Sequence, residues 1–181
     1  MKELALHLLD IAENSVAAKA RNVTLAVIAD EANDRLRLIV QDDGKGMDAQ
    51  TAARIVDPFV TSRTTRKVGL GLPLLKSAAE ACNGGLSIQS EIGKGTQVTV
   101  EFQLNHIDRM PVGDFPSTCL NLLVGYPEIH WIFLYTSNKS QFEFDDQPIK
   151  QELTGVPLSD PLILGYLRQN LEEGFAETKL I

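Results

Sequence analysis

Asp10 and Asn14 are four positions apart in an alanine- and leucine-rich segment without glycine or proline. Side chains at this spacing project from one face of an α-helix, so the carboxylate and the amide lie side by side. Together they offer oxygen ligands for a divalent cation or hydrogen-bond partners for a water molecule. Glu13 points about 100° away from Asn14 and is the poorer partner. On this helix alone, an ordinary polar surface stripe is the simpler interpretation.

Two glycine-rich segments could lie close to a ligand. Asp42–Met47, with the sequence DDGKGM, directly follows an expected strand, where a carboxylate could accept from an exocyclic amine such as that of adenine. Val68–Leu72, with the sequence VGLGL, begins an expected helix, and the free amides of a helix N-terminus favour phosphate groups. Each motif is weak by itself, because a hairpin turn or a plain helix start has the same composition.

The segment between these motifs has the opposite charge to the rest of the chain. Residues 57–69 hold three basic residues and one acidic residue, a net charge of +2, whereas the chain as a whole has −7. Basic and hydroxyl side chains suit a polyphosphate, although a solvated loop could carry the same residues. The overall negative charge disfavours a broad nucleic-acid surface.

Composition indicates an ordinary globular protein. The chain has 181 residues, of which 44% are hydrophobic and 23% charged, which excludes wholesale disorder and fits one domain or a domain with a large appendage. Cys82 and Cys119 form no CxxC motif, so a disulfide framework or a zinc site is not expected. There is no apolar run of the roughly 20 residues that a membrane helix needs, and Glu3, His7 and Asp10 do not suit a signal peptide. We therefore expect a cytoplasmic protein with no membrane partner.

The order of expected elements favours an α+β fold. Helices are expected at residues 3–20, 48–56 and 70–82, and strands at 23–29, 35–41, 86–91 and 97–104. Neighbouring strands joined by short turns predict a two-layer sandwich with a mixed, mostly antiparallel sheet and helices on one face. We expect this domain to span residues 1–104, followed by a linker at 105–116 and a smaller α+β extension at 117–181.

The extension contains an apolar segment, residues 130–136, in which both faces of an expected strand are apolar. Its odd-numbered members are aromatic, and they are Trp131, Phe133 and Tyr135. We expect this strand to pack into the core or to extend the sheet, with a partner-docking surface as the alternative.

Taken in order, the motifs resemble the GHKL superfamily, which contains DNA gyrase, a heat-shock chaperone, histidine kinases and MutL. Asp10–Asn14 resembles the N box, Asp42–Gly46 the first glycine box, Pro58-Phe59 the F box and Val68–Leu72 the second glycine box. Gly93–Thr96 resembles a segment of the kinase branch. The resemblance covers residues 3–104 and is strongest to the ATP-binding domain of histidine kinases and anti-sigma kinases.

This resemblance implies the Bergerat ATP-binding fold and a site for ATP or ADP with Mg²⁺. Asn14 would be the metal ligand, Asp42 would accept from the adenine amine, and Asp10 would be the catalytic residue. Residues 57–67 would form the lid over ATP. The expected cofactor-binding residues are Asn14, Asp42, Gly44, Gly46, Met47, Phe59, Arg63, Arg66, Lys67, Gly69, Leu70, Gly71, Leu72 and Thr96.

Three positions depart from the family pattern. Lys67 stands where the kinase-type second glycine box usually has one more glycine, and Asp43 replaces a usual asparagine. Asp10 replaces the glutamate that orients water in ATP-hydrolysing members. Because its side chain is one carbon shorter, we expect hydrolysis to be slow or absent.

We expect any phosphoryl transfer to go to another protein. Only nine residues precede Asp10, which leaves no room for a phosphoacceptor hairpin. His7 lies on the expected helix and suits a supporting role, whereas His106 and His130 lie in the linker and at a strand start. The first interpretation is therefore a regulator that phosphorylates or otherwise regulates an unidentified partner protein. A slow ATPase or switch of the MutL type, and a nucleotide-binding module without turnover, are the alternatives; a homodimer is also left open.

Overall fold

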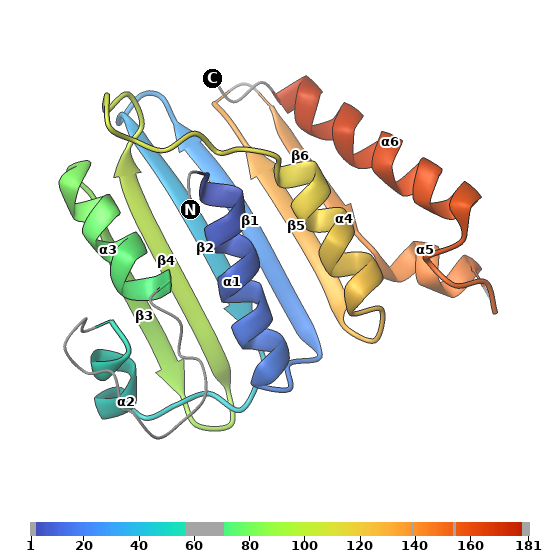
Figure 1. The fold of residues 1–181 in the computed structure, drawn as a ribbon, viewed down its shortest axis with the longest axis horizontal. Helices are drawn as coiled ribbons and strands as arrows, with labels where there is room; N and C mark the ends of the chain where they lie inside the picture. The colour runs from blue at the N-terminus through green and yellow to red at the C-terminus, as the bar shows by residue number, and fades with distance from the viewer. Residues whose placement is uncertain (1–2, 57–70, 139, 154, 179–181) are drawn as a thin grey trace.

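The computed structural model describes residues 3–56, 71–138, 140–153 and 155–178. These residues form one six-stranded sheet of order β3-β4-β2-β1-β5-β6, and α1, α3 and α4 lie side by side over one face of it (Figure 1). All neighbouring strands are antiparallel except β1 and β5, which are parallel. The predicted α+β sandwich with a mixed, mostly antiparallel sheet is therefore confirmed. The elements are α1 Leu4–Ala17, β1 Asn22–Asp30, β2 Arg35–Asp42, α2 Ala49–Arg54, α3 Gly71–Ala81, β3 Gly85–Glu91, β4 Gly95–Gln103, α4 Phe115–Gly125, β5 His130–Thr136, β6 Gln141–Asp145, α5 Gln147–Glu152 and α6 Pro161–Thr178.

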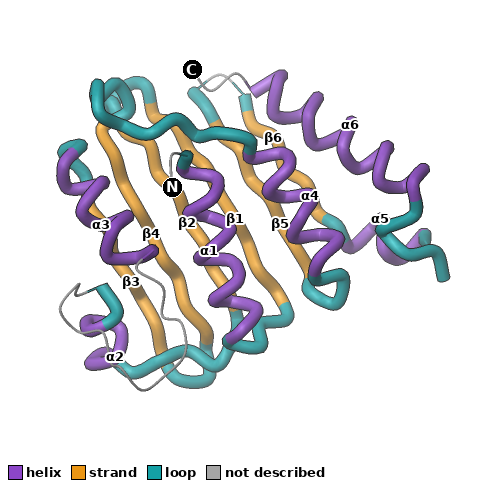
Figure 2. The backbone as a smooth tube through the Cα atoms, in the orientation of Figure 1, coloured by secondary structure: helices purple, strands orange, loops and turns teal. Residues whose placement is uncertain are grey.

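Strand β2 shows why the sequence pattern leads to this sheet. Leu36, Leu38 and Val40 are buried under the helices, whereas Arg37 and Ile39 are partly exposed on the other face. Successive strand residues point to opposite faces, so an alternating sequence buries one face only. The helices consequently cover a single side of the sheet, as Figure 2 also shows.

The strand from the second half of the chain extends the sheet. β5 pairs in parallel with β1, so that Asn22 lies opposite His130 and Leu25 opposite Phe133. The buried aromatic residues Trp131 and Phe133 belong to the same apolar core as the residues under α1. The expected extension therefore shares both the sheet and the core of the first half.

The segment expected to be a linker is bound to the fold. It runs past the start of α1 towards α4 (Figure 2), where Leu4 N donates to Pro111 O over 3.0 Å and Ala5 N to Val112 O over 2.8 Å. These bonds satisfy amides that a helix N-terminus leaves without intrahelical partners. Helix α4 begins at Phe115, within the expected linker, because Asp114 accepts from Ser117 N and caps the helix.

Asp146 occupies the N-cap position of α5, but its side chain makes no capping hydrogen bond. Instead, its carboxylate lies 2.6 Å from Lys150 Nζ, one helical turn later. A contact of this length between an ammonium group and a carboxylate is a charge-assisted hydrogen bond. Among the described residues, no helix combines the length and apolarity needed to span a membrane.

Candidate functional site

A cavity of about 240 Å³ lies beneath the C-terminal half of α1, at the end of β2 and the start of α3. It brings together Asn14, Asp42, Met47, Leu72 and Thr96, five of the residues expected from the sequence. The remaining lining residues are Ile11, Ser15, Ala17, Ala18, Lys45, Ile55 and Val98. The wall is mainly apolar and has a few convergent polar groups, which is typical of a small-molecule site.

Asp42 is held in the cavity by two hydrogen bonds. Ser15 Oγ donates to Asp42 Oδ2 over 2.6 Å, and Gly44 N donates to Asp42 Oδ1 over 2.9 Å. A carboxylate has about four acceptor positions, so Asp42 can still accept from a ligand amine. Thr96 lies opposite Asp42 in the β2–β4 register, which places its side chain at the same end of the sheet.

Ser15 was missed by sequence reasoning as the partner of Asp42. The only available signal was its position directly after Asn14, the last residue of the N box.

Ser90 was also missed by sequence reasoning. Its hydroxyl accepts from Met47 N, donates to Gly95 O, and lies 2.9 Å from Thr96 Oγ1. Ser90 thus ties the first glycine box to the β3–β4 hairpin.

Asp43 has a different role from Asp42. Its Oδ1 accepts from Arg21 N and Asn22 N over 2.7 and 2.9 Å, and its Oδ2 accepts from Asn22 Nδ2 over 2.6 Å. Burial raises the pKa of Asp43, but the hydrogen bonds from Asn22 and Arg21 outweigh it, and the pKa lies below its usual value. Asp43 therefore anchors the glycine box to the start of β1.

The glycine of the first box that the fold needs most is Gly46. It has a φ of +62°, and a Cβ placed there would lie 1.9 Å from the Glu91 carbonyl oxygen. Gly44 is also tight, because a Cβ there would lie 2.9 Å from the Cβ of Ala18 on the α1 side. Both glycines thus allow the loop to pack against protein backbone, and their contact with a ligand stays a prediction.

Asp10, on α1, directs its carboxylate towards the start of α3. A Cβ on Gly71 would be 3.2 Å from Asp10 Oδ2, so the carboxylate faces the N-terminal end of that helix. One turn earlier on α1, His7 is buried, and its Nδ1 has no hydrogen-bond partner among the residues that the structure describes. Burial lowers the pKa of His7, while the charge of Asp10 acts in the opposite direction. A neutral imidazole next to Asp10 fits the supporting role expected for His7.

Several expected site residues cannot be placed. Phe59, Arg63, Arg66, Lys67, Gly69 and Leu70, together with the expected lid at residues 57–67, lie outside the described residues. The described part of the candidate site consists of the cavity and the N-box helix.

The part of the chain from α1 to β4 matches a known protein family. Residues 2–106 match the family described as "Histidine kinase-, DNA gyrase B-, and HSP90-like ATPase". The chain belongs to this ATPase family. The match ends just after β4, so α4 to α6 and β5 to β6 lie beyond the family domain.

The relatives of this ATPase domain include sensor proteins. The chain is 35% identical over 103 residues to a "Putative sensor protein" of Shewanella frigidimarina. The aligned region covers 56% of this chain and 16% of that protein. The chain is also 41% identical over 92 residues to the "Sensor protein kinase FleS" of Pseudomonas aeruginosa. This aligned region covers 51% of this chain and 23% of FleS. The chain thus spans less than a quarter of the length of these relatives, in a domain similar to histidine-kinase ATP-binding domains.

One solved structure is similar over most of the chain. The alignment with the "N terminal domain of a DNA repair protein" covers 80% of this chain and 52% of the chain in that structure. The TM-score is 0.50 and the sequence identity is 16%. At this identity the likeness concerns the fold alone.

Proposed function

We propose that the chain binds ATP with Mg²⁺ in this cavity and thereby phosphorylates or regulates a partner protein in trans. The observation that supports it most directly is Asp42 in the cavity, held by Ser15 and Gly44 with acceptor positions to spare. Adenine has an exocyclic amine that such a carboxylate recognises. Met47, Ile55 and Leu72 supply apolar wall for the flat base.

The N-box helix supplies oxygen ligands for Mg²⁺. Asn14 is exposed and lines the cavity, and Asp10 lies one turn earlier on the same helix. Amide and carboxylate oxygens suit this hard cation, so Asn14 would hold it between the phosphates and the protein. When bound, Mg²⁺ neutralises phosphate charge. The phosphates would extend from the cavity towards the start of α3, where helix amides favour anions.

A slow ATPase or an ATP-driven switch is the second candidate. Its supporting observation is the position of Asp10, whose carboxylate faces the N-terminal end of α3. A general base there could act on a water molecule near the terminal phosphate. The partner, the cytoplasmic location and a homodimeric state remain parts of the proposal.

Incubation with γ-labelled ATP and Mg²⁺ tests this proposal. Proteins captured from a lysate on the immobilised chain are added to one half of the samples, and Asp42→Ala serves as the binding-deficient control. We expect label on a captured protein with the parent chain only. Release of labelled phosphate without labelled protein would favour the ATPase. If the chain binds ATP but neither labelled protein nor labelled phosphate forms, the result would favour a nucleotide-binding module without turnover.

A further inference from the structure

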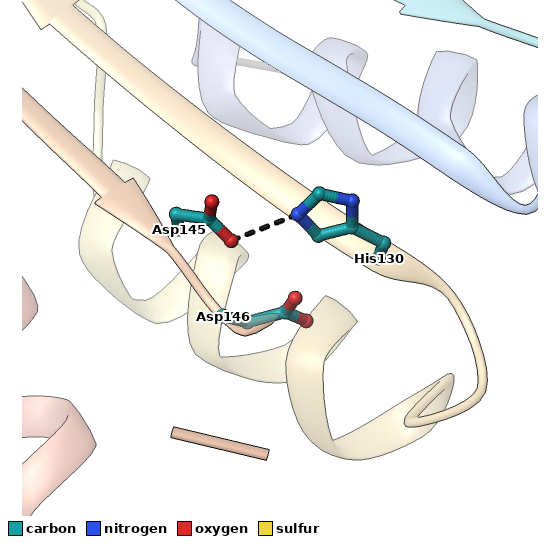
Figure 3. Close-up of side chains that lie close together, drawn as sticks. All are labelled: His130, Asp145 and Asp146. Atoms are coloured by element: carbon teal, nitrogen blue, oxygen red, sulfur yellow. Dashed lines mark hydrogen bonds and ion pairs between the residues drawn. The ribbon is translucent and has the colours of Figure 1, made fainter. Parts of the chain in front are cut away.

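A continuous chain of side-chain hydrogen bonds runs from the end of β6 to the first glycine box. Asp145 Oδ1 lies 2.8 Å from His130 Nε2, as the dashed line in Figure 3 shows. His130 Nδ1 lies 2.9 Å from Asn22 Oδ1, and Asn22 Nδ2 donates to Asp43 Oδ2 over 2.6 Å. Because Asp43 follows Asp42 in the sequence, this relay ends beside the residue proposed to bind adenine.

The carboxylates at the two ends set the direction of every bond in the relay. An ionised carboxylate only accepts, so the Asn22 amide turns its nitrogen towards Asp43 and its oxygen towards His130. His130 Nδ1 must then donate to that oxygen. The other ring nitrogen faces Asp145, which again only accepts. Both ring nitrogens of His130 therefore face acceptor oxygens, one on Asn22 and one on Asp145.

The backbone around the relay holds the same segment. Arg21 O accepts from His130 N over 2.8 Å, and Asn22 O accepts from Asp43 N over 3.3 Å. Asp43 Oδ1 in turn accepts from Arg21 N and Asn22 N. The turn between α1 and β1 is thus fixed between β5 on one side and the glycine box on the other. A shift of His130 would be passed on to Asp43 through this turn.

The neighbouring Asp146 does not belong to the relay. Figure 3 shows it near His130 and Asp145, and ligand atoms of the three lie within 4.8 Å of one another. However, Asp146 pairs with Lys150 Nζ at 2.6 Å, and both His130 nitrogens already face acceptors. A cation would have to displace the Lys150 ammonium group and break the contacts of His130 with Asn22 and Asp145, so the geometry favours hydrogen bonding over metal binding.

We infer that His130 is a positioning residue of the nucleotide site, acting through Asn22 and Asp43 on Asp42. The inference rests on the proposed nucleotide binding and adds a function for β5 and β6, which lie beyond the family domain. Without His130, the Asn22 amide loses the partner of its oxygen and can rotate. Asp43 then loses a charge-assisted bond, and the Asp42–Gly44 turn is less well ordered for the base.

The test measures Mg-ADP affinity by isothermal titration calorimetry in the full chain. Four proteins form a double-mutant cycle: the parent, His130→Ala, Asp43→Ala and the double variant. We expect His130→Ala to weaken binding about three- to tenfold. The double variant should bind no more weakly than Asp43→Ala, because both changes interrupt one relay. Glu143→Ala, at an exposed position on β6, is the matched control and should keep the parent's affinity.

Equal Mg-ADP affinity of the parent and His130→Ala would overturn the inference. The inference would also fail if the loss of binding free energy in the double variant equalled the sum of the losses in the two single variants. A purely structural role would lower the melting temperature but leave affinity unchanged well below it. A parent that fails to bind Mg-ADP would overturn the proposed function and, with it, this inference. Should His130→Ala not fold, nuclear magnetic resonance on the parent decides: the Asn22 side-chain amide signals should shift on saturation with Mg-ADP, and unchanged signals would contradict the relay.

Discussion

Ser15 Oγ donates a 2.6 Å hydrogen bond to Asp42 Oδ2, and this bond joins the N-box helix to the end of the central strand β2. Ser15 is buried, and its neighbour Asn14 faces the cavity. This contact ties the residue next to the proposed metal ligand to the proposed adenine acceptor. A short bond to a charged acceptor is well suited to this task, because it is stronger than a bond between neutral groups.

The first prediction concerns this pair. Ser15→Ala should weaken Mg-ADP binding about three- to tenfold, because Asp42 loses the donor that orients it. Ser87→Ala, at an exposed position on β3, is the matched control and should bind as the parent does. Titration calorimetry on the three proteins provides the measurement. Equal affinities for Ser15→Ala and Ser87→Ala would show that the bond does not orient the site.

The second prediction concerns Asp42 itself. Mg-ATP or Mg-ADP should raise the melting temperature of the parent, since a ligand that binds only the folded state stabilises it by mass action. Asp42→Ala should abolish this rise while still unfolding cooperatively. Differential scanning fluorimetry over a series of nucleotide concentrations tests it, and a normal nucleotide response in Asp42→Ala would refute the assignment of adenine to this residue.

The third prediction compares two glycines that both have positive φ. Gly46 has a φ of +62° and Gly93 of +78°, but only at Gly46 would a Cβ meet backbone, 1.9 Å from Glu91 O. Alanine at either position should cost about 1–2 kcal/mol through the left-handed conformation. Gly46→Ala should cost about 1–3 kcal/mol more because the hairpin must move. Urea unfolding measures both, and equal losses would contradict the packing explanation.

The fourth prediction concerns hydrolysis. We expect weak ATPase activity that requires Mg²⁺ and falls in Asn14→Ala. Asp10→Asn should lower the rate about tenfold or more, because an amide cannot take a proton from water, while nucleotide affinity is kept. Glu13→Gln, at an exposed position on the same helix, is the control and should hydrolyse as the parent does. A phosphate-release assay measures the rates, and parental turnover in Asp10→Asn would remove Asp10 as the base.

The fifth prediction concerns acid stability. The pKa of Asp43 is raised by burial and lowered more strongly by its hydrogen bonds, so the folded value lies below the unfolded one. Such a group stabilises the fold above its unfolded pKa of about 3.9 and loses this effect as the pH falls through the folded pKa. Asp43→Asn should therefore be less stable than the parent at pH 7, and this difference should shrink below about pH 4. Urea unfolding at several pH values checks it; a constant difference would contradict the shift.

Local features of the chain were predictable because they depend on local rules. The alternation of Leu36, Leu38 and Val40 required a strand with one buried face. Asp48 accepts from Thr51 N over 2.7 Å and begins α2 where the sequence indicated. The ends of β5 also agree with the expected residues 130–136, since turn-forming residues mark them. Motif order in addition predicted the family and the α+β fold.

The site required contacts between distant segments, which no local rule supplies. Ser15 and Asp42 are 27 positions apart, and His130 and Asn22 are 108 apart. The sequence identified Asp42 and Asn14 by type and spacing, but it could not show that a serine orients one of them. It left open whether residues 130–136 dock a partner or extend the sheet, because both need an apolar strand. The parallel pairing of β5 with β1 decides this, since only the folded sheet places His130 beside Asn22 and thereby connects the second half of the chain to the glycine box.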